Sequence, residues 1–169
     1  KEINTDFLQE LSELILENSK KIIQEKISDL HVADIGELIK NLSIEQAHDL
    51  FQLLDEEKSA LVLMEVEEEV REQLLSNLSS KEIATEVIEN LESDDATDVI
   101  SELSHEKKEE VLSLIEDDEH ASDITDLLSY PEDTAGGLMA KELIKVNENW
   151  NTLQCLKETS KQASEDKKV

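Results

Sequence analysis

Residues that interrupt helices are scarce in this sequence. Its 169 residues include one Pro and three Gly. Because Pro removes a backbone donor and Gly costs conformational entropy, their scarcity leaves long stretches able to form helices. Pro131 and two of the glycines, Gly136 and Gly137, lie together in the segment YPEDTAGGLM at 130–139. We interpret this cluster as a corner between two domains, residues 1–129 and 130–169.

Cysteine and long apolar runs are almost absent as well. Cys155 is the only cysteine, which excludes an internal disulfide and a thiolate metal cluster. The longest apolar run, ALVLM at 60–64, is far shorter than the ~20 residues that a membrane-spanning helix requires. The chain opens on Lys1 without a secretory signal and ends in a polar run, so we expect it to be part of a longer protein.

Basic residues are few, and the net charge is strongly negative. The chain has 16 Lys and Arg against 43 Asp and Glu, a formal charge of −27. Residues 130–169 hold six Lys and seven acids, so nearly all of the excess acid lies in residues 1–129. A polyanion repels nucleic acid and anionic lipid, so the expected partners are cations or basic surfaces.

A sequence repeat of about twelve residues runs through the acidic residues 1–129. An apolar residue followed by a polar one recurs at 42, 54, 66, 78, 91, 103 and 115, in steps of 12, 12, 12, 13, 12 and 12. Two of the units have capping-box spacing, Ser43 with Gln46 and Ser79 with Glu82. Each unit therefore predicts one short helix that begins at a capping residue.

Aromatic residues make up only 2% of the chain, and many acids with few aromatics can indicate disorder. Here the apolar residues recur at helical spacing, for example Ala96, Val99, Ile100 and Leu103. Such short helices are unstable alone, so their apolar stripes must pack on one another. We predict an all-α fold, a right-handed superhelical array (solenoid) of short helices.

The two ends of the chain differ from the repeat. Residues 6–30 carry a longer apolar stripe that predicts a helix or helix pair capping the array. After the corner, Leu143–Val146 is compatible with a β-strand, and a helix follows with Thr152 as its candidate N-cap. A strand followed by a helix is part of an α/β unit.

Catalytic motifs are not recognisable in this sequence. No Ser, Cys or Thr stands beside a base in a known arrangement, the four His are scattered, and no Gly-rich loop could hold a phosphate. We expect no enzyme.

Clustered acids are the remaining candidates for a site. Most acidic runs are expected to be solvated surface, but ESDDATDV places Asp94, Asp95 and Asp98 three and four positions apart. Carboxylates that converge on one helical side favour a hard cation such as Mg²⁺. The absence of an EF-hand loop argues against a calcium buffer.

The order of these parts resembles the cytosolic amino-terminal region of bacterial MgtE-type magnesium transporters. The resemblance rests on YPEDTAGGLMAKELIKVNEN after an acidic helical array, then TLQCLKE, and extends from about residue 30 onward. In that family a helical N domain leads through such a segment into paired CBS domains and a membrane channel.

The resemblance implies a magnesium-sensing gate in a homodimer, on the cytoplasmic side of the cell membrane. It implies that residues 130–169 are a linker and the truncated beginning of the first CBS domain. It places Mg²⁺ ligands on Asp94 and Asp98, with Asp95 as neighbour, and on the backbone carbonyl of Gly137. A further acid of the family falls on Leu61 here, which leaves that ligand absent or replaced by an adjacent acid. The CBS domains and the transmembrane pore would be partners within the same full-length chain.

The sequence is also compatible with a second function. An acidic α-solenoid could be a protein-interaction adaptor, with its acids as a docking surface for a basic segment and without a metal-sensing role. An adaptor does not require the linker motif or the strand and helix after it.

Overall fold

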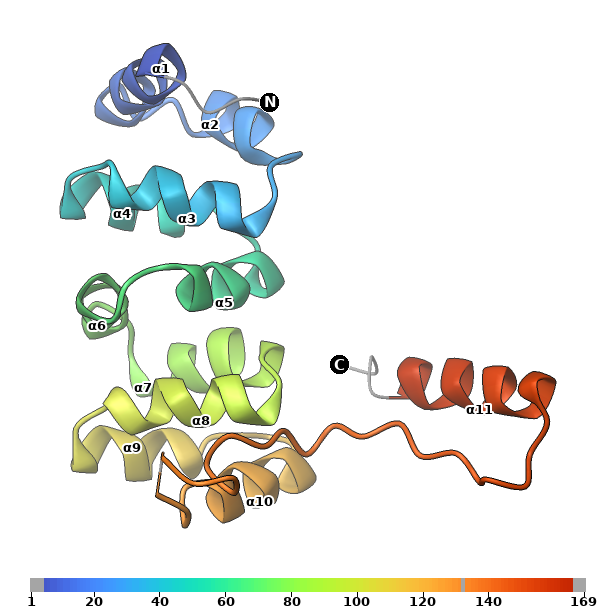
Figure 1. The fold of residues 1–169 in the computed structure, drawn as a ribbon. Coiled ribbons are helices and arrows are strands. Elements are labelled where there is room, and N and C mark those ends of the chain that lie inside the picture. The colour runs from blue at the N-terminus through green and yellow to red at the C-terminus, as the bar shows by residue number, and fades with distance from the viewer. Residues whose placement is uncertain (1–4, 132, 166–169) are drawn as a thin grey trace.

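The helices of this protein stack into a column, shown by a computed structural model that describes residues 5–131 and 133–165 (Figure 1). A final helix lies to one side of the column at the end of an extended segment. The elements are α1 (Thr5–Leu16), α2 (Lys20–Ile27), α3 (Val32–Lys40), α4 (Ile44–Phe51), α5 (Glu56–Glu65), α6 (Glu68–Ser76), α7 (Ser80–Glu82), the π-helix η1 (Ile83–Val87), the 3₁₀-helix η2 (Ile88–Asn90), α8 (Ser93–Glu102), α9 (His105–Leu112), α10 (Asp118–Leu127) and α11 (Thr152–Glu165). The predicted all-α array of short helices is confirmed.

Capping residues divide the column into units at the predicted positions. The polar residue of the repeat is the N-cap of α4, α5, α6, α7, α8 and α9, and only at α10 does the cap fall one residue later, on Asp117. Both predicted capping boxes are present. In the second box Ser79 N donates to Glu82 Oε2 over 2.8 Å, and Glu82 N donates to Ser79 Oγ over 3.2 Å. Helix ends that satisfy their own backbone donors allow a chain to restart a helix every twelve residues.

Most units pack on the unit two places further along the chain. Helix α3 contacts α5, α4 contacts α6, α7 contacts α9 and α8 contacts α10. The buried side chains form two clusters, one over α1–α5 and one from α4 to α10, and Leu54 and Val70 pack against both. The apolar core is therefore continuous along the column.

One unit holds an extra residue, and its helix absorbs it. The step from Leu78 to Leu91 is thirteen residues instead of twelve, and this unit contains the π-helix η1. A π-turn accommodates a single additional residue within a helix without moving the residues on either side. Ile83 and Ile88 remain fully buried, and Leu91 is 6% exposed, so the apolar stripe continues in register.

The predicted amphipathic segment at 6–30 is a pair of helices, α1 and α2. Asn18 joins them with φ 55°, the one positive φ among the described residues other than glycine. Leu11, Ile15, Ile23 and Ile27 are buried as the stripe predicts. Ile22 is 48% exposed, because it shares the outer side of α2 with the lysines.

The predicted strand at Leu143–Val146 is extended chain without a strand partner. Residues 142–147 have no regular structure, and no strand occurs in residues 5–131 and 133–165. The Gln162 side chain of α11 takes the place of a neighbouring strand at one point, accepting from Lys145 N over 2.7 Å and donating to Lys145 O over 2.8 Å.

Asn151, and not the predicted Thr152, caps α11. Gln154 N donates to Asn151 Oδ1 and Asn151 N donates to Gln154 Oε1, each over 3.0 Å. Thr152 is the first helical residue.

No helix in the part of the chain that the structure describes is long and apolar enough to cross a membrane.

Gly36 provides a test of the packing between α3 and α5. Replacing a helical Gly by Ala ordinarily stabilises a helix by about 1 kcal/mol. At Gly36 a Cβ would lie 2.8 Å from Glu65 Cβ and 3.2 Å from Glu65 O. We therefore expect Gly36→Ala to lower the free energy of unfolding by about 1–3 kcal/mol, as overpacking does. Urea unfolding followed by circular dichroism measures the change.

Lys40→Ala, at an exposed position of the same helix, is the matched control, and we expect it to change stability by less than about 0.5 kcal/mol. A gain in stability for Gly36→Ala would contradict the close approach of α3 to α5.

Candidate metal centre

Helix α8 carries the three aspartates that the sequence singles out. Asp94 and Asp95 lie in its first turn, and Asp98 lies one turn further on. Acids are favourable in a first turn because the helix dipole is positive there. Asp94 and Asp95 are half-buried and Asp98 is exposed, so all three can be reached from the surface.

The start of α8 is capped by a residue from the segment after the column. The side chain of its N-cap residue, Glu92, makes no capping hydrogen bond. Instead the carboxylate of Glu142 accepts from Ser93 N over 2.9 Å and from Ser93 Oγ over 2.8 Å. Lys141 N donates to Ser93 Oγ over 3.1 Å, and Lys141 Nζ forms an ion pair with Asp126 on α10. Residues 141 and 142 thus fasten this segment to α8 and α10.

Three carboxylates meet where the segment joins α8. Glu92, Asp94 and Glu142 each offer an oxygen, and these oxygens all lie within 4.8 Å of one another. Burial raises the pKa of Glu92, and the nearby carboxylates of Glu142, Asp94 and Asp95 raise it further. Burial also raises the pKa of Glu142, but the hydrogen bonds from Ser93 outweigh it and the pKa lies below its ordinary value. Crowded acids of this kind gain from a counter-ion.

Asp98 and Gly137 line a second part of the site. Both border a surface hollow of about 510 Å³ between α8, the end of α10 and residues 130, 131, 133 and 137. Lys108 of α9 and Asp133 also line it. The Asp98 carboxylate and the glycine-containing turn therefore line the same hollow.

The turn at 133–138 shows why one of its glycines is required. Thr134 Oγ1 donates to Pro131 O over 2.7 Å and accepts from Gly137 N over 3.3 Å. None of the described glycines has a positive φ, so their use here is not a left-handed backbone. A Cβ on Gly136 would lie 2.4 Å from Cδ1 of Tyr130, because the tyrosine ring packs directly on this residue.

The four predicted ligand residues fall into distinct groups. Asp94 joins Glu92 and Glu142, while Asp98 shares its hollow with Gly137. For Asp95, burial raises the pKa, the charges of Asp94 and Asp98 add to this, and the charge of Arg71 opposes it. Sequence reasoning missed Glu142, which lies 49 positions from Ser93 and shows no periodic relation to α8. Leu61, where the resemblance implies a lost ligand, is a surface residue of α5 with 37% exposure.

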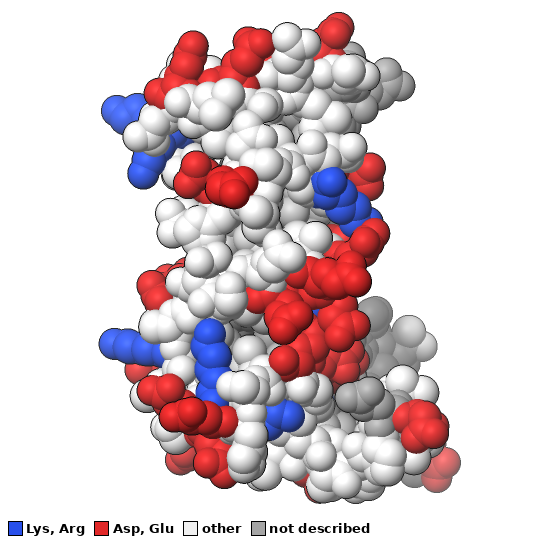
Figure 2. Space-filling model, turned by 90° about the vertical axis from the view of Figure 1, so that its left-hand side faces the viewer, with Lys and Arg blue, Asp and Glu red and all other residues white. Residues whose placement is uncertain are grey.

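Acidic side chains gather on one face of the column. Figure 2 shows them crowded around its middle, with few Lys or Arg among them.

Comparison with known families decides the relationship. A model of the MgtE intracellular N domain matches residues 30–133, which is more than half of the chain. The chain belongs to the MgtE N-domain family. A comparison with curated proteins gives no match.

Two solved structures share the fold of this MgtE N domain. One is the cytosolic domain of the Mg²⁺ channel MgtE in complex with ATP, with 25% identity and a TM-score of 0.81 over 96% of this chain and 65% of that one. The other is the soluble part of a magnesium transporter, with 23% identity and a TM-score of 0.76 over 93% of this chain and 61% of that one. This MgtE chain spans less than two thirds of either solved chain.

The bond between Ser93 and Glu142 predicts how firmly the segment after the MgtE N domain is held. Ser93→Ala removes the hydroxyl that donates to Glu142 and accepts from Lys141 N. Because a hydrogen bond to a charged group contributes about 1.5–3 kcal/mol, we expect amide exchange at residues 140–143 to accelerate about tenfold or more. Hydrogen exchange with mass spectrometry measures this.

Glu148→Gln, at an exposed acid of the same segment, should leave the exchange of residues 140–143 unchanged. Equal protection in Ser93→Ala and the unmodified protein would show that Glu142 does not hold the segment.

Proposed function

We propose that this chain is the cytosolic, Mg²⁺-sensing region of a magnesium transporter or channel. The observation that carries the proposal is the meeting of acids from α8 with the segment at 130–142, through Glu142 and through the hollow that Asp98 and Gly137 share. Membership of the MgtE N-domain family and the magnesium transport named for both structural relatives support it.

The donor set fits a hard divalent cation. Carboxylate oxygens and a backbone carbonyl are the ligands that Mg²⁺ prefers, and it retains several waters when few protein ligands are present. Asp94 and Asp98, with Asp95 as neighbour and the carbonyl of Gly137, would hold Mg²⁺ in two groups, Asp94 in one and Asp98 with Gly137 in the other. We add Glu92 and Glu142 to this set, because their oxygens lie beside that of Asp94.

Gating follows from the charge of these residues. At low divalent concentration the acids of α8 repel acidic surfaces that face them. Bound Mg²⁺ supplies two positive charges that neighbouring carboxylates can share. The residues of α8 then favour the arrangement in which the domains associate, and the population shifts in proportion to the difference in affinity between the two states.

The remaining parts of the proposal concern the whole transporter. We propose that residues 130–169 are a linker and the beginning of a CBS domain. The apolar side chains of Leu143, Ile144, Leu153 and Leu156 are exposed here and can pack against further elements of such a domain. A homodimer, a transmembrane pore in the same full-length chain and a position on the cytoplasmic side of the membrane complete the proposal. The function is regulatory, without catalysis.

Replacing the aspartates of α8 tests the site. We expect the chain to bind Mg²⁺ in the millimolar range. The double variant Asp94→Asn with Asp98→Asn should bind Mg²⁺ at least about tenfold more weakly, since two charged ligands are lost. Titration with MgCl₂, followed by the NMR amide shifts of residues 92–98 and 137, measures the affinity and locates it.

Glu56→Gln with Glu57→Gln is the matched control, because it removes two exposed first-turn acids from α5. It should bind Mg²⁺ as the unmodified chain does. If both double variants weaken binding equally, the cation is held by the general negative field and the proposed site is wrong.

A further inference from the structure

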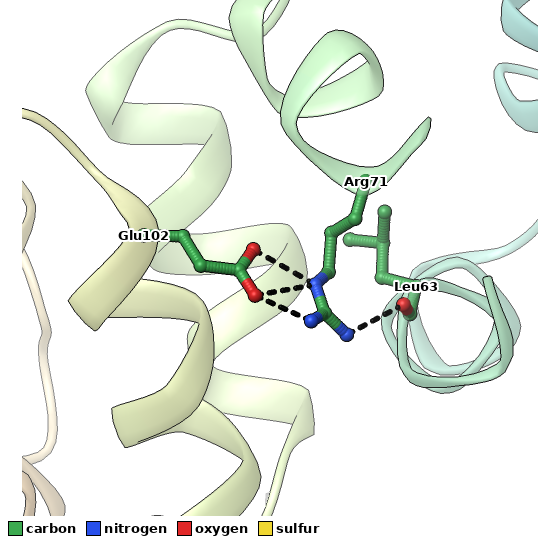
Figure 3. A network of polar contacts seen from close by, with 3 residues as sticks. All are labelled: Leu63, Arg71 and Glu102. Carbon is green, nitrogen blue, oxygen red and sulfur yellow. Dashed lines mark hydrogen bonds and ion pairs between the residues drawn. The ribbon is translucent and has the colours of Figure 1, made fainter. Parts of the chain in front are cut away.

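Arg71 is held in a fixed position between three helices. It belongs to α6, and its side chain is 13% exposed, while that of its partner Glu102 on α8 is 15% exposed. Arg71 Nε donates to the two carboxylate oxygens of Glu102 over 3.1 and 2.9 Å, and Nη2 pairs with the same carboxylate. Nη1 donates to Leu63 O of α5 over 3.2 Å, and Figure 3 shows the guanidinium between these groups.

Glu102 lies on the same side of α8 as two aspartates of the candidate site. Asp95, Asp98 and Glu102 are three and four positions apart, so they follow one another along the helix face near α6. Glu102, the partner of Arg71, is thus one helical turn from Asp98. The pKa of Arg71 is raised first by its hydrogen bonds with Glu102, which outweigh burial, and then by the charges of Glu102, Asp98 and Glu68.

We propose that Arg71 is a resident cation that weakens Mg²⁺ binding at Asp95 and Asp98, and that Glu102 is the positioning residue that keeps its guanidinium from pairing with them. This inference rests on the proposed function, because it concerns the affinity of the same site.

The chemistry of arginine makes the position of Glu102 decisive. A guanidinium forms strong paired hydrogen bonds with a carboxylate, and three carboxylates on this face of α8 could accept them. Glu102 takes three of these bonds, and the carbonyl of Leu63 takes another. The charge of Arg71 nevertheless remains close to Asp95 and Asp98 and opposes a second cation there. The affinity is then low enough for the ion to leave when its concentration falls.

Removing the resident charge tests the first half of the proposal. In a Mg²⁺ titration of the chain, Arg71→Gln should bind about fivefold more tightly, from the loss of repulsion at a separation of several ångströms. Lys107→Gln removes the same charge from a half-buried lysine that donates to Leu75 O and Leu78 O at the C-terminal end of α6. That control should change the affinity by less than about twofold.

A double-mutant cycle tests the second half. Glu102→Gln should weaken Mg²⁺ binding about tenfold when Arg71 is present, because the released guanidinium pairs with an aspartate. Combined with Arg71→Gln, the same change should weaken binding less than about threefold, since only one acid is lost. If Glu102→Gln has the same effect in both backgrounds, Glu102 acts by its own charge and the positioning role is wrong.

The unmodified protein offers a measurement that does not depend on variants that fold. The Nε–H of Arg71 should exchange slowly with solvent because it donates to Glu102, and its NMR signal should shift at the same Mg²⁺ concentration as the amides of Asp95 and Asp98. If the amides of Asp95 and Asp98 shift with Mg²⁺ but the Arg71 Nε–H signal does not, the inference about Arg71 is wrong and the proposed function is unaffected. An absence of Mg²⁺ shifts along α8 overturns the proposed function.

Discussion

The structure depends on the packing of each short helix against the helix two units away. With 8 to 10 residues, α4, α5, α6, α8 and α9 are too short to persist alone in water, because a few turns do not recover the cost of nucleation. Burial of Leu50, Leu63, Leu74 and Ile100 in the continuous core supplies the missing stability. Caps at every junction satisfy the backbone donors that frequent restarts leave exposed.

This constraint also decides where the charge lies. A core filled by one apolar stripe from each unit leaves the other faces to polar residues, and most of these are acidic here. Arg71 and Lys141 bridge elements near α8, and each has a defined carboxylate partner: Arg71 pairs with Glu102 and Lys141 with Asp126. Burial raises the pKa values of Glu92 and Asp95, and the acids that exceed these partners near α8 raise both further. The segment after the column adds Glu142 to this excess while using it as a helix cap.

Local signals made most of the fold predictable. The repeat located the caps because a capping residue acts within three positions of its partner, as at Ser43 and Ser79. The aspartates of α8 could be found for the same reason. The partners of α8 could not, because Glu142 and Arg71 reach it from other elements and their own neighbourhoods carry no mark of that contact. The sequence does not distinguish Asn151 from Thr152 as the N-cap of α11, because both residues are good caps. Only the reciprocal hydrogen bonds between Asn151 and Gln154 identify Asn151 as the cap.

The π-turn in η1 has a consequence for how such a column tolerates change in length. A residue gained inside a unit is looped into the helix, and the aspartates that follow keep their orientation toward the neighbouring chain segment. The same gain at a junction would displace the next cap and turn every later helix about its axis. Insertions in relatives should therefore occur within helical units. The acids should then face the same direction even where their spacing along the chain differs.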